Sequence, residues 1–420
     1  MTIETEVPTA GRLKALVVLC VMQLMIILDG TVVTVALPTL QRDLGFSAAG
    51  LAWVMNSYLI AFAGLLLLAG RLGDLIGGKR VFVAGLGLFT AASLLCGIAT
   101  SAEVLIAGRF LQGVGGALAS AVILGMIVGL FPAPGEQARA MGIYSFTSAS
   151  GASIGLILGG VITETIGWHW AFLINVPIGL LALLFAQRLL TRERGLGLGK
   201  GADVLRAALV AIVRMFRSRQ MTVANVVVML LFAAGFGFQF MTALYLQRVL
   251  GYDSLSTGLA FLPAPLMNAL MSLSIAPRLT VRYGPRRMLL VGLALFALAL
   301  LWLSQAPVDG SYVVNVAPVL AVMGAGVGVA IPAAIMLAMA AAAPSDAGLA
   351  SGLNNTAQQA GAAVGTAVLA TLAAATTSQR LSDGAGELLA LRDGYSVAWI
   401  AAAGFVAAGL LLTIALIRRR

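Results

Sequence analysis

Long apolar stretches divide the chain along its whole length, and short polar segments separate them. Each stretch is about 20 residues long, which is the length of α-helix that crosses a ~30 Å hydrocarbon core. The pattern predicts an all-α membrane protein with twelve transmembrane helices, over residues 16–37, 50–70, 81–100, 104–130, 139–162, 170–190, 221–247, 255–276, 288–305, 313–341, 348–376 and 395–417.

The composition agrees with a lipid environment, because 60% of the residues are hydrophobic and only 10% are charged. In a soluble domain, roughly a quarter of the residues are charged. The two cysteines, Cys20 and Cys96, lie inside apolar stretches, which favours small buried side chains over a disulfide or a metal site. The stretch 16–37 is too long for a cleavable signal peptide, so we expect it to remain as the first span.

The positive charges are distributed unevenly between the two sides of the membrane. With the N-terminus in the cytoplasm, the 26 Lys and Arg residues all lie on the cytoplasmic side except five: Arg42, Arg248, Arg380 and Arg392 outside, and Arg109 within a span. The positive-inside rule therefore predicts a multi-pass protein of the plasma (inner) membrane with both termini in the cytoplasm. The net charge of +10 then reflects topology and does not indicate a nucleic-acid partner.

One long interior connection, residues 191–220, divides the chain into an N-terminal six-helix half, 1–190, and a C-terminal six-helix half, 221–420. Its apolar run, Ala207 to Val213, is too short to cross a bilayer. We therefore expect a cytoplasmic linker with a short surface helix over 203–216.

The two halves contain an internal repeat. Residues 71–89, RLGDLIGGKRVFVAGLGLF, correspond to residues 278–296, RLTVRYGPRRMLLVGLALF, and PGEQARAMG at 134–142 corresponds to PSDAGLASG at 344–352. Parallel repeats of this kind are typical of transporters that bind substrate between two halves near the bilayer midplane. Gene duplication without transport is the alternative.

Four motifs occur in order along the first half: LDGTVVTVALP at 28–38, GRLGDLIGGKR at 70–80, RFLQGVGGA at 109–117 and GASIGLILGG at 151–160. They resemble the first-span, loop 2–3, fourth-span and fifth-span signatures of the major facilitator superfamily. The first-span motif resembles that of the drug:proton antiporter group, which usually has fourteen spans. In the second half, FRSRQMTVAN at 216–225 and the region Asn354–Gln359 are similar to actinobacterial members of that group. The resemblance implies the major facilitator fold, with two pseudo-symmetric six-helix halves.

The chain departs from that group in two places. Leu156 stands where the fifth-span motif normally has proline, and only residues 201–216 occupy the place of two extra central spans. A natural twelve-span member and an engineered deletion both fit this sequence.

Two charged residues lie well inside predicted spans: Asp29 near the middle of the first and Arg109 in the fourth. An ionised side chain in the membrane costs several kcal/mol unless it is paired or hydrated. We therefore predict that Asp29 and Arg109 interact. A carboxylate in such surroundings can bind and release a proton, so the pair is the candidate for proton coupling. A permanent structural ion pair is the alternative.

The loop after the second span is a candidate cytoplasmic gate, formed by Gly70, Gly73, Asp74, Gly77 and Arg80. Glycines permit a tight turn and close helix ends, and Asp74 can accept hydrogen bonds from backbone N–H groups or an arginine. The resemblance implies that this loop latches the cytoplasmic side in the outward-facing state, whereas a basic turn that only sets topology is the alternative. The second copy of the repeat has Val281 where Asp74 stands, which favours a specific role for Asp74.

The fifth-span motif contributes Gly151, Gly155, Gly159 and Gly160. The first three are four residues apart and so share one helix face, which predicts close packing between helices.

Polar and aromatic residues inside the spans outline a candidate substrate cavity: Gln23, Asn56, Tyr58, Gln112, Tyr144, Phe236, Gln239, Asn268, Asn354 and Gln358. Each residue alone is more often a helix–helix hydrogen bond or a packing residue than a ligand contact. As a set with a single carboxylate, they favour neutral or cationic lipophilic compounds over sugars or phosphates.

The sequence therefore predicts a proton-coupled antiporter that exports small lipophilic, drug-like compounds by alternating access. The expected partners are the substrate and the lipid bilayer, the coupling ion is the proton, and no cofactor, metal, nucleic acid or ATP is expected. We expect a monomer. The alternatives are a dedicated exporter of a self-made metabolite or antibiotic, and a non-transporting membrane scaffold or sensor. An enzyme is disfavoured because the spans contain no cluster of His, Cys and carboxylate residues.

Overall fold

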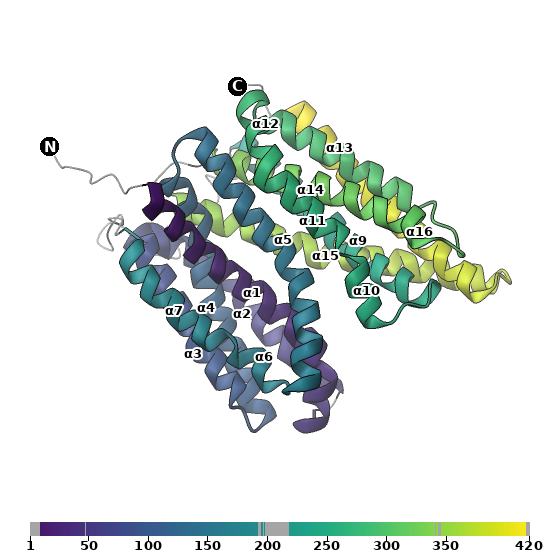
Figure 1. Ribbon diagram of the computed structural model, residues 1–420, viewed down its shortest axis with the longest axis horizontal. Coiled ribbons are helices and arrows are strands. Elements are labelled where there is room, and N and C mark those ends of the chain that lie inside the picture. Colours follow the sequence, from purple (N-terminus) through teal and green to yellow (C-terminus); the bar gives the residue numbers. More distant parts are fainter. Residues whose placement is uncertain are drawn as a thin grey trace. The chain divides into compact units, whose positions relative to one another are not determined.

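A computed structural model describes residues 9–46, 48–191, 195, 197, 218–340, 342 and 346–416. Every ordered element within these ranges is a helix, and they contain no strand (Figure 1). The predicted all-α fold class is confirmed. The predicted surface helix over 203–216 and most of the linker 191–220 lie outside the described residues.

The helices of the first half extend beyond the predicted spans at most ends, because hydropathy detects only the part in hydrocarbon. Helix α1, for example, has 35 residues. Helices α6 and α7 follow each other directly and together form the sixth span. The bounds are α1 (Thr9–Asp43), α2 (Ala48–Ile76), α3 (Gly78–Gly97), α4 (Ala102–Leu130), α5 (Pro134–Thr165), α6 (His169–Leu173) and α7 (Asn175–Leu189).

The described part of the second half contains three π-helical turns: η2 follows α9, η3 joins α11 to α12, and η4 precedes α14. The predicted span 255–276 is divided into short helices. Helix α11 begins at Pro263, which lacks the N–H group that would continue the previous helix, and Pro277 is the second residue of α12. The bounds are α9 (Arg219–Leu244), η2 (Tyr245–Val249), α10 (Ser254–Ala260), α11 (Pro263–Leu270), η3 (Met271–Ile275), α12 (Ala276–Tyr283), α13 (Pro285–Leu303), η4 (Tyr312–Val316), α14 (Ala317–Met339), α15 (Ala347–Ser382) and α16 (Glu387–Leu416).

Eleven helical segments in the described part of the chain have the length and hydropathy of a membrane span. Helix α5 has 32 residues and coincides with the predicted span 139–162. With α5, the helices follow the predicted twelve-span pattern of the fold class.

The helices form two compact units. Unit 1 contains Met1–Ala140, Ile154–Arg214 and Ala342–Asn355, and unit 2 contains Met141–Ser153, Met215–Ala341 and Thr356–Arg420. In unit 1, α4 packs on α2 and α3, and α7 packs on α1 and α3. In unit 2, α14 packs on α11 and α13, and α16 packs on α9 and α13. The same pairing of spans therefore occurs in both units, in agreement with the sequence repeat.

Glycines permit close contacts between these helices at repeat-related positions. A Cβ atom added to Gly85 in α3 would lie 2.5 Å from the backbone nitrogen of Ala119 in α4. A Cβ atom added to Gly292 in α13 would lie 2.6 Å from the backbone nitrogen of Ala330 in α14. Since such distances are shorter than van der Waals contact, only glycine allows these helices to approach so closely.

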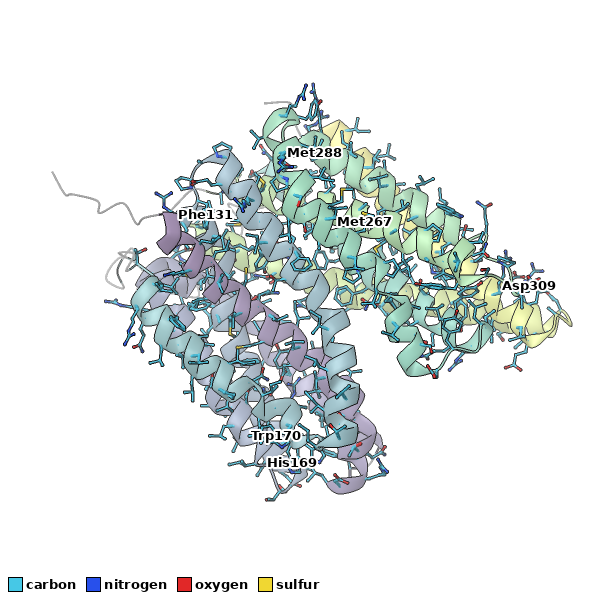
Figure 2. All side chains as sticks on the ribbon, viewed as in Figure 1. Phe131, His169, Trp170, Met267, Met288 and Asp309 are labelled. Carbon is cyan, nitrogen blue, oxygen red and sulfur yellow. The ribbon has the colours of Figure 1, made fainter. Side chains whose placement is uncertain are left out.

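The loops on either side of α5 lie at opposite ends of unit 1. Figure 2 shows Phe131, which follows α4, near one end, and His169 and Trp170, which begin α6, at the other. Helix α5 therefore connects two ends of a bundle, as a membrane span must.

Candidate functional site

A buried ion pair between α1 and α4 is the centre of the candidate site. Nη1 of Arg109 donates to Oδ2 of Asp29, and both side chains have no solvent exposure. No other charged side chain in the described part of the chain is buried to this degree. The structure thus brings together the two residues that the sequence pairs, while their role in proton coupling stays a prediction.

Gln112 connects both charges. Its Oε1 accepts from Nη1 of Arg109 at 3.0 Å, and its Nε2 donates to Oδ1 of Asp29 at 2.9 Å and to Oγ of Ser93 at 2.8 Å. Residues three apart in a helix share a face, which places Gln112 beside Arg109 on α4. The sequence placed Gln112 among the cavity residues, and in the structure it belongs to the charged site. Ser93 was not predicted, although its hydroxyl group in an apolar stretch is a weak signal.

Arg109 also contacts α2 and α6. Its Nε donates to the carbonyl oxygen of Val54 at 3.0 Å. The ring of Tyr58 lies over the guanidinium group, with the ring centroid 4.4 Å from Cζ, and the ring of Phe172 lies 5.9 Å away. Tyr58 is a second predicted cavity residue that joins this site. We call Asp29, Ser93, Arg109, Gln112 and Tyr58 the charge cluster.

Two side chains of α4 hold the carboxylate group of Asp29. Each carboxylate oxygen already accepts a hydrogen bond, one from Arg109 and one from Gln112. Loss of the negative charge on Asp29 would weaken both hydrogen bonds, because a charge-assisted hydrogen bond is stronger than a neutral one. Because removal of one partner from a buried pair leaves an uncompensated charge, the two residues are strongly coupled.

Asp74 forms the second contact of functional interest. It lies near the C-terminal end of α2, which the sequence predicts to be cytoplasmic. Its Oδ1 accepts from the backbone nitrogen of Gly348 at 2.7 Å, and its Oδ2 accepts from that of Leu349 at 3.1 Å. Both amides belong to the first turn of α15, where N–H groups have no partner within the helix and the helix dipole favours negative charge. An ion pair between Arg71 and Asp346, at 3.5 Å, lies beside them.

The other predicted gate residues occupy this region in different ways. Gly70 lies against the backbone of Gly348, where an added Cβ atom would overlap the carbonyl oxygen, and Gly73 packs on Val122. Gly77 separates α2 from α3 with a φ of +99°, a conformation that favours glycine. Arg80 is exposed and donates to the carbonyl oxygen of Ile76, so this hydrogen bond lies in the α2–α3 turn and not at α15.

We expect Asp74→Ala to loosen the first turn of α15, because it removes two charge-assisted hydrogen bonds. Ser351 is fully buried in this turn, so a Ser351→Cys substitution provides a thiol reporter. Labelling of that thiol by a small maleimide should become about tenfold faster when Asp74 is replaced, which corresponds to ~1.4 kcal/mol. The matched control is Asp383→Ala, which removes an exposed carboxylate after α15. Equal labelling rates with and without Asp74→Ala would leave the loop with a topological role alone.

The fifth-span glycines differ in their surroundings. Gly151, Gly155 and Gly159 are buried in α5, whereas Gly160 has open space around it. A Cβ atom on Gly155 would overlap the side chain of Thr31 in α1. Helix α5 therefore packs closely on α1 one turn from Asp29.

The remaining predicted cavity residues are divided between the two units. Gln23, Asn56 and Asn354 lie in unit 1, and Tyr144, Phe236, Gln239, Asn268 and Gln358 lie in unit 2. The side chains of Gln23, Tyr144, Asn268 and Asn354 are buried. Those of Gln239 and Gln358 are half-buried, and those of Asn56 and Phe236 are exposed. A common cavity formed by these residues stays a prediction. The described residues contain no group of three His, Cys, Asp or Glu side chains that could hold a metal ion.

Comparison with known proteins agrees with this arrangement of helices. The sequence profile of the Major Facilitator Superfamily matches residues 19–366. The puromycin resistance protein pur8 of Streptomyces alboniger is 36% identical, over 97% of this chain and 90% of its own length. The cephamycin export protein CmcT of Amycolatopsis lactamdurans is 33% identical, over 96% of this chain and 92% of its own length.

Solved structures show the same fold at low sequence identity. The human organic anion transporter MFSD10 (TETRAN) superposes with a TM-score of 0.73 at 16% identity, covering 96% of this chain and 99% of that one. The proton:xylose symporter XylE superposes with a TM-score of 0.69 at 15% identity, covering 96% of each chain. Since the family profile covers most of the chain and exporters are among its relatives, this multi-pass membrane protein belongs to the Major Facilitator Superfamily and is a transporter, not an enzyme.

Proposed function

We propose that this transporter is a proton-coupled antiporter that exports small lipophilic compounds, neutral or cationic, across the plasma membrane by alternating access. The observation that carries the proposal is the Asp29–Arg109 pair, which contains the only charged side chains buried in the described part of the chain. A charge in the membrane is expensive and marks an ion or proton pathway. The names of two relatives, which refer to puromycin resistance and cephamycin export, support an antibiotic-like substrate.

In the proposed cycle, Asp29 exchanges its hydrogen bonds for a proton. A proton from the outer side binds one carboxylate oxygen and displaces Arg109 or Gln112 from it. The neutral carboxyl group then releases the guanidinium group, and the proton leaves to the cytoplasm when the ion pair forms again. Substrate leaves in the opposite direction, so the proton is the coupling ion and no cofactor takes part.

The contact between Asp74 and α15 is proposed to form and break during the same cycle. Helix α15 begins in unit 1 at Ala347 and continues into unit 2 after Asn355. Release of its first turn from Asp74 would free this helix at the cytoplasmic end when the transporter opens to that side. One chain contains both halves of the repeat, and we propose that the monomer in the lipid bilayer is the transporting unit.

A dedicated exporter of a self-made antibiotic is the second candidate. The tetracenomycin C resistance and export protein of Streptomyces glaucescens, which is 30% identical over 91% of this chain, favours it. A narrow substrate range supports this alternative, and a broad range supports export of many drugs. Family membership sets aside the non-transporting scaffold or sensor.

Vesicles that contain the purified protein test the proposal directly. With an imposed pH gradient, a cationic dye and puromycin should each move against the direction of proton flow, and a pH-sensitive dye should record the protons. Collapse of the gradient with a protonophore should stop substrate accumulation. Accumulation that continues without the gradient, or that moves no protons, would contradict proton coupling.

The orientation can be checked by thiol labelling of intact cells. Gly386 lies between α15 and α16 with open space around it, so a Gly386→Cys thiol should react with a membrane-impermeant maleimide from outside. An Arg282→Cys thiol, near the end of α12, should react only after the cells are opened. The native cysteines Cys20 and Cys96 are buried and give no background. The reverse pattern would overturn the proposed cytoplasmic termini.

A further inference from the structure

We propose that the ring of Tyr58 stabilises the guanidinium cation of Arg109 while Asp29 is protonated, and that Tyr58 thereby sets the pH at which proton coupling occurs. Tyr58 is in this sense a positioning residue for the pair. The inference rests on the proposed function, because it assumes that Asp29 exchanges a proton during transport.

The surroundings of Arg109 contain few groups that can replace a carboxylate. Its hydrogen-bond partners besides Asp29 are Oε1 of Gln112 and the carbonyl oxygen of Val54, each at 3.0 Å. Its Nη2 has no acceptor among the described residues. The ring of Tyr58, centred 4.4 Å from Cζ, is the nearer of two aromatic faces, and the ring of Phe172 is 5.9 Å away.

Protonation of Asp29 changes the balance of these contacts. Arginine stays charged at any physiological pH, so a neutral Asp29 leaves a fully buried cation without a counter-ion. The cation then depends on neutral oxygens and on the electron-rich ring of Tyr58, and a cation–π contact is strongest where water is excluded. In the ion-paired state the carboxylate already neutralises Arg109, so the ring contributes less there. Tyr58 therefore stabilises the protonated state of Asp29 more than the ion-paired state.

The ring of Tyr58 is closely packed by residues of α2 and α4. The ring stacks on Phe62 with a centroid separation of 5.6 Å. Gly113 and Gly116 allow α4 to pack closely against α2 at Tyr58. A Cβ atom on Gly113 would overlap the Tyr58 carbonyl oxygen, and one on Gly116 would lie 3.3 Å from the Tyr58 hydroxyl group. The hydroxyl group itself has no hydrogen-bond partner among the described residues. Tyr58 thus contacts Arg109 through its aromatic face and not through its hydroxyl group.

Few titratable groups surround Asp29 among the described residues. The titratable groups around Asp29 are Arg109 on α4, Tyr58 on α2 and Cys96 on α3, whose Sγ lies 3.4 Å from Oε1 of Gln112. Helix α6 contributes the ring of Phe172, and its titratable residue His169 is exposed, as is Arg188 of α7. On α5, Glu136 and Arg139 are exposed, and Tyr144 is buried in unit 2.

The test is the pH profile of dye efflux in vesicles for the full-length transporter. Tyr58→Leu removes the ring, which makes protonation of Asp29 less favourable. The midpoint of the profile should move to more acidic pH by about one unit, a tenfold change in proton concentration that equals ~1.4 kcal/mol. Tyr58→Phe keeps the ring face and should retain the wild-type midpoint. Phe89→Leu, which removes a fully buried ring from α3, is the matched control and should also leave the midpoint unchanged.

Two outcomes overturn the inference: an unshifted midpoint in Tyr58→Leu, or an equal shift in Tyr58→Phe. Substrate exchange without a pH gradient shows that each variant is folded, and Tyr58→Met replaces Tyr58→Leu if the latter does not fold. Failure of the proposed function is distinguishable, because Asp29→Asn would then retain full proton-driven efflux whatever the Tyr58 variants do.

Discussion

Asp29→Asn should abolish proton-driven efflux while the transporter still folds and inserts. The amide has the shape of the protonated carboxyl group and keeps an oxygen that can accept from Arg109, but it cannot exchange a proton. The variant therefore resembles one state of the proposed cycle and cannot reach the other. In vesicles with an imposed pH gradient, dye accumulation should fall to the level of vesicles without protein, while substrate exchange without a gradient continues.

Asp43→Asn is the matched control for this result. Asp43 is the last residue of the same helix and is exposed, and its Oδ2 accepts from Nε1 of Trp168 at 3.0 Å. The same chemical change there should leave the dye gradient intact. If Asp29→Asn vesicles build the same pH-driven gradient as the wild type, Asp29 is not the coupling residue and the ion pair is structural.

Arg109→Met should strongly destabilise the protein, because it leaves the carboxylate of Asp29 buried without a counter-ion. Removal of one partner from a buried ion pair typically costs ~3–5 kcal/mol. The melting temperature in detergent and the yield of monodisperse protein should both fall.

A second substitution separates the structural effect from the functional one. Asp29→Asn combined with Arg109→Met removes both charges and should recover most of the lost stability, but it should not recover proton-driven efflux. Arg80→Met removes an exposed arginine and serves as the control for loss of positive charge. An Arg109→Met protein that melts at the wild-type temperature at neutral pH would show that the pair does not contribute to the fold.

The sequence by itself determined the number and approximate position of the spans. Backbone N–H and C=O groups have no water to bind in lipid, so an apolar stretch of sufficient length must become a helix. The same solvent made the partner of Asp29 predictable, because a buried carboxylate needs an opposite charge and Arg109 is the one basic residue well inside another predicted span. Gly85 and Gly292 also occupy equivalent positions of the repeat between 71–89 and 278–296, and both lie at a close contact between two helices.

Only the tertiary structure decided which neutral residues join the charges and what Asp74 contacts. Gln112 and Tyr58 have the same sequence signal as Gln23 and Asn56, a polar or aromatic residue in an apolar stretch. Their meeting at Arg109 depends on the rotation and crossing of α2 and α4, which hydropathy does not encode.

The partners of Asp74 are backbone amides more than 270 residues away. Any helix N-terminus offers such amides, so no side chain in the sequence marks them. Gly70 and Gly348 allow the two backbones to approach, and this contact between distant segments exists only once α2 and α15 have packed.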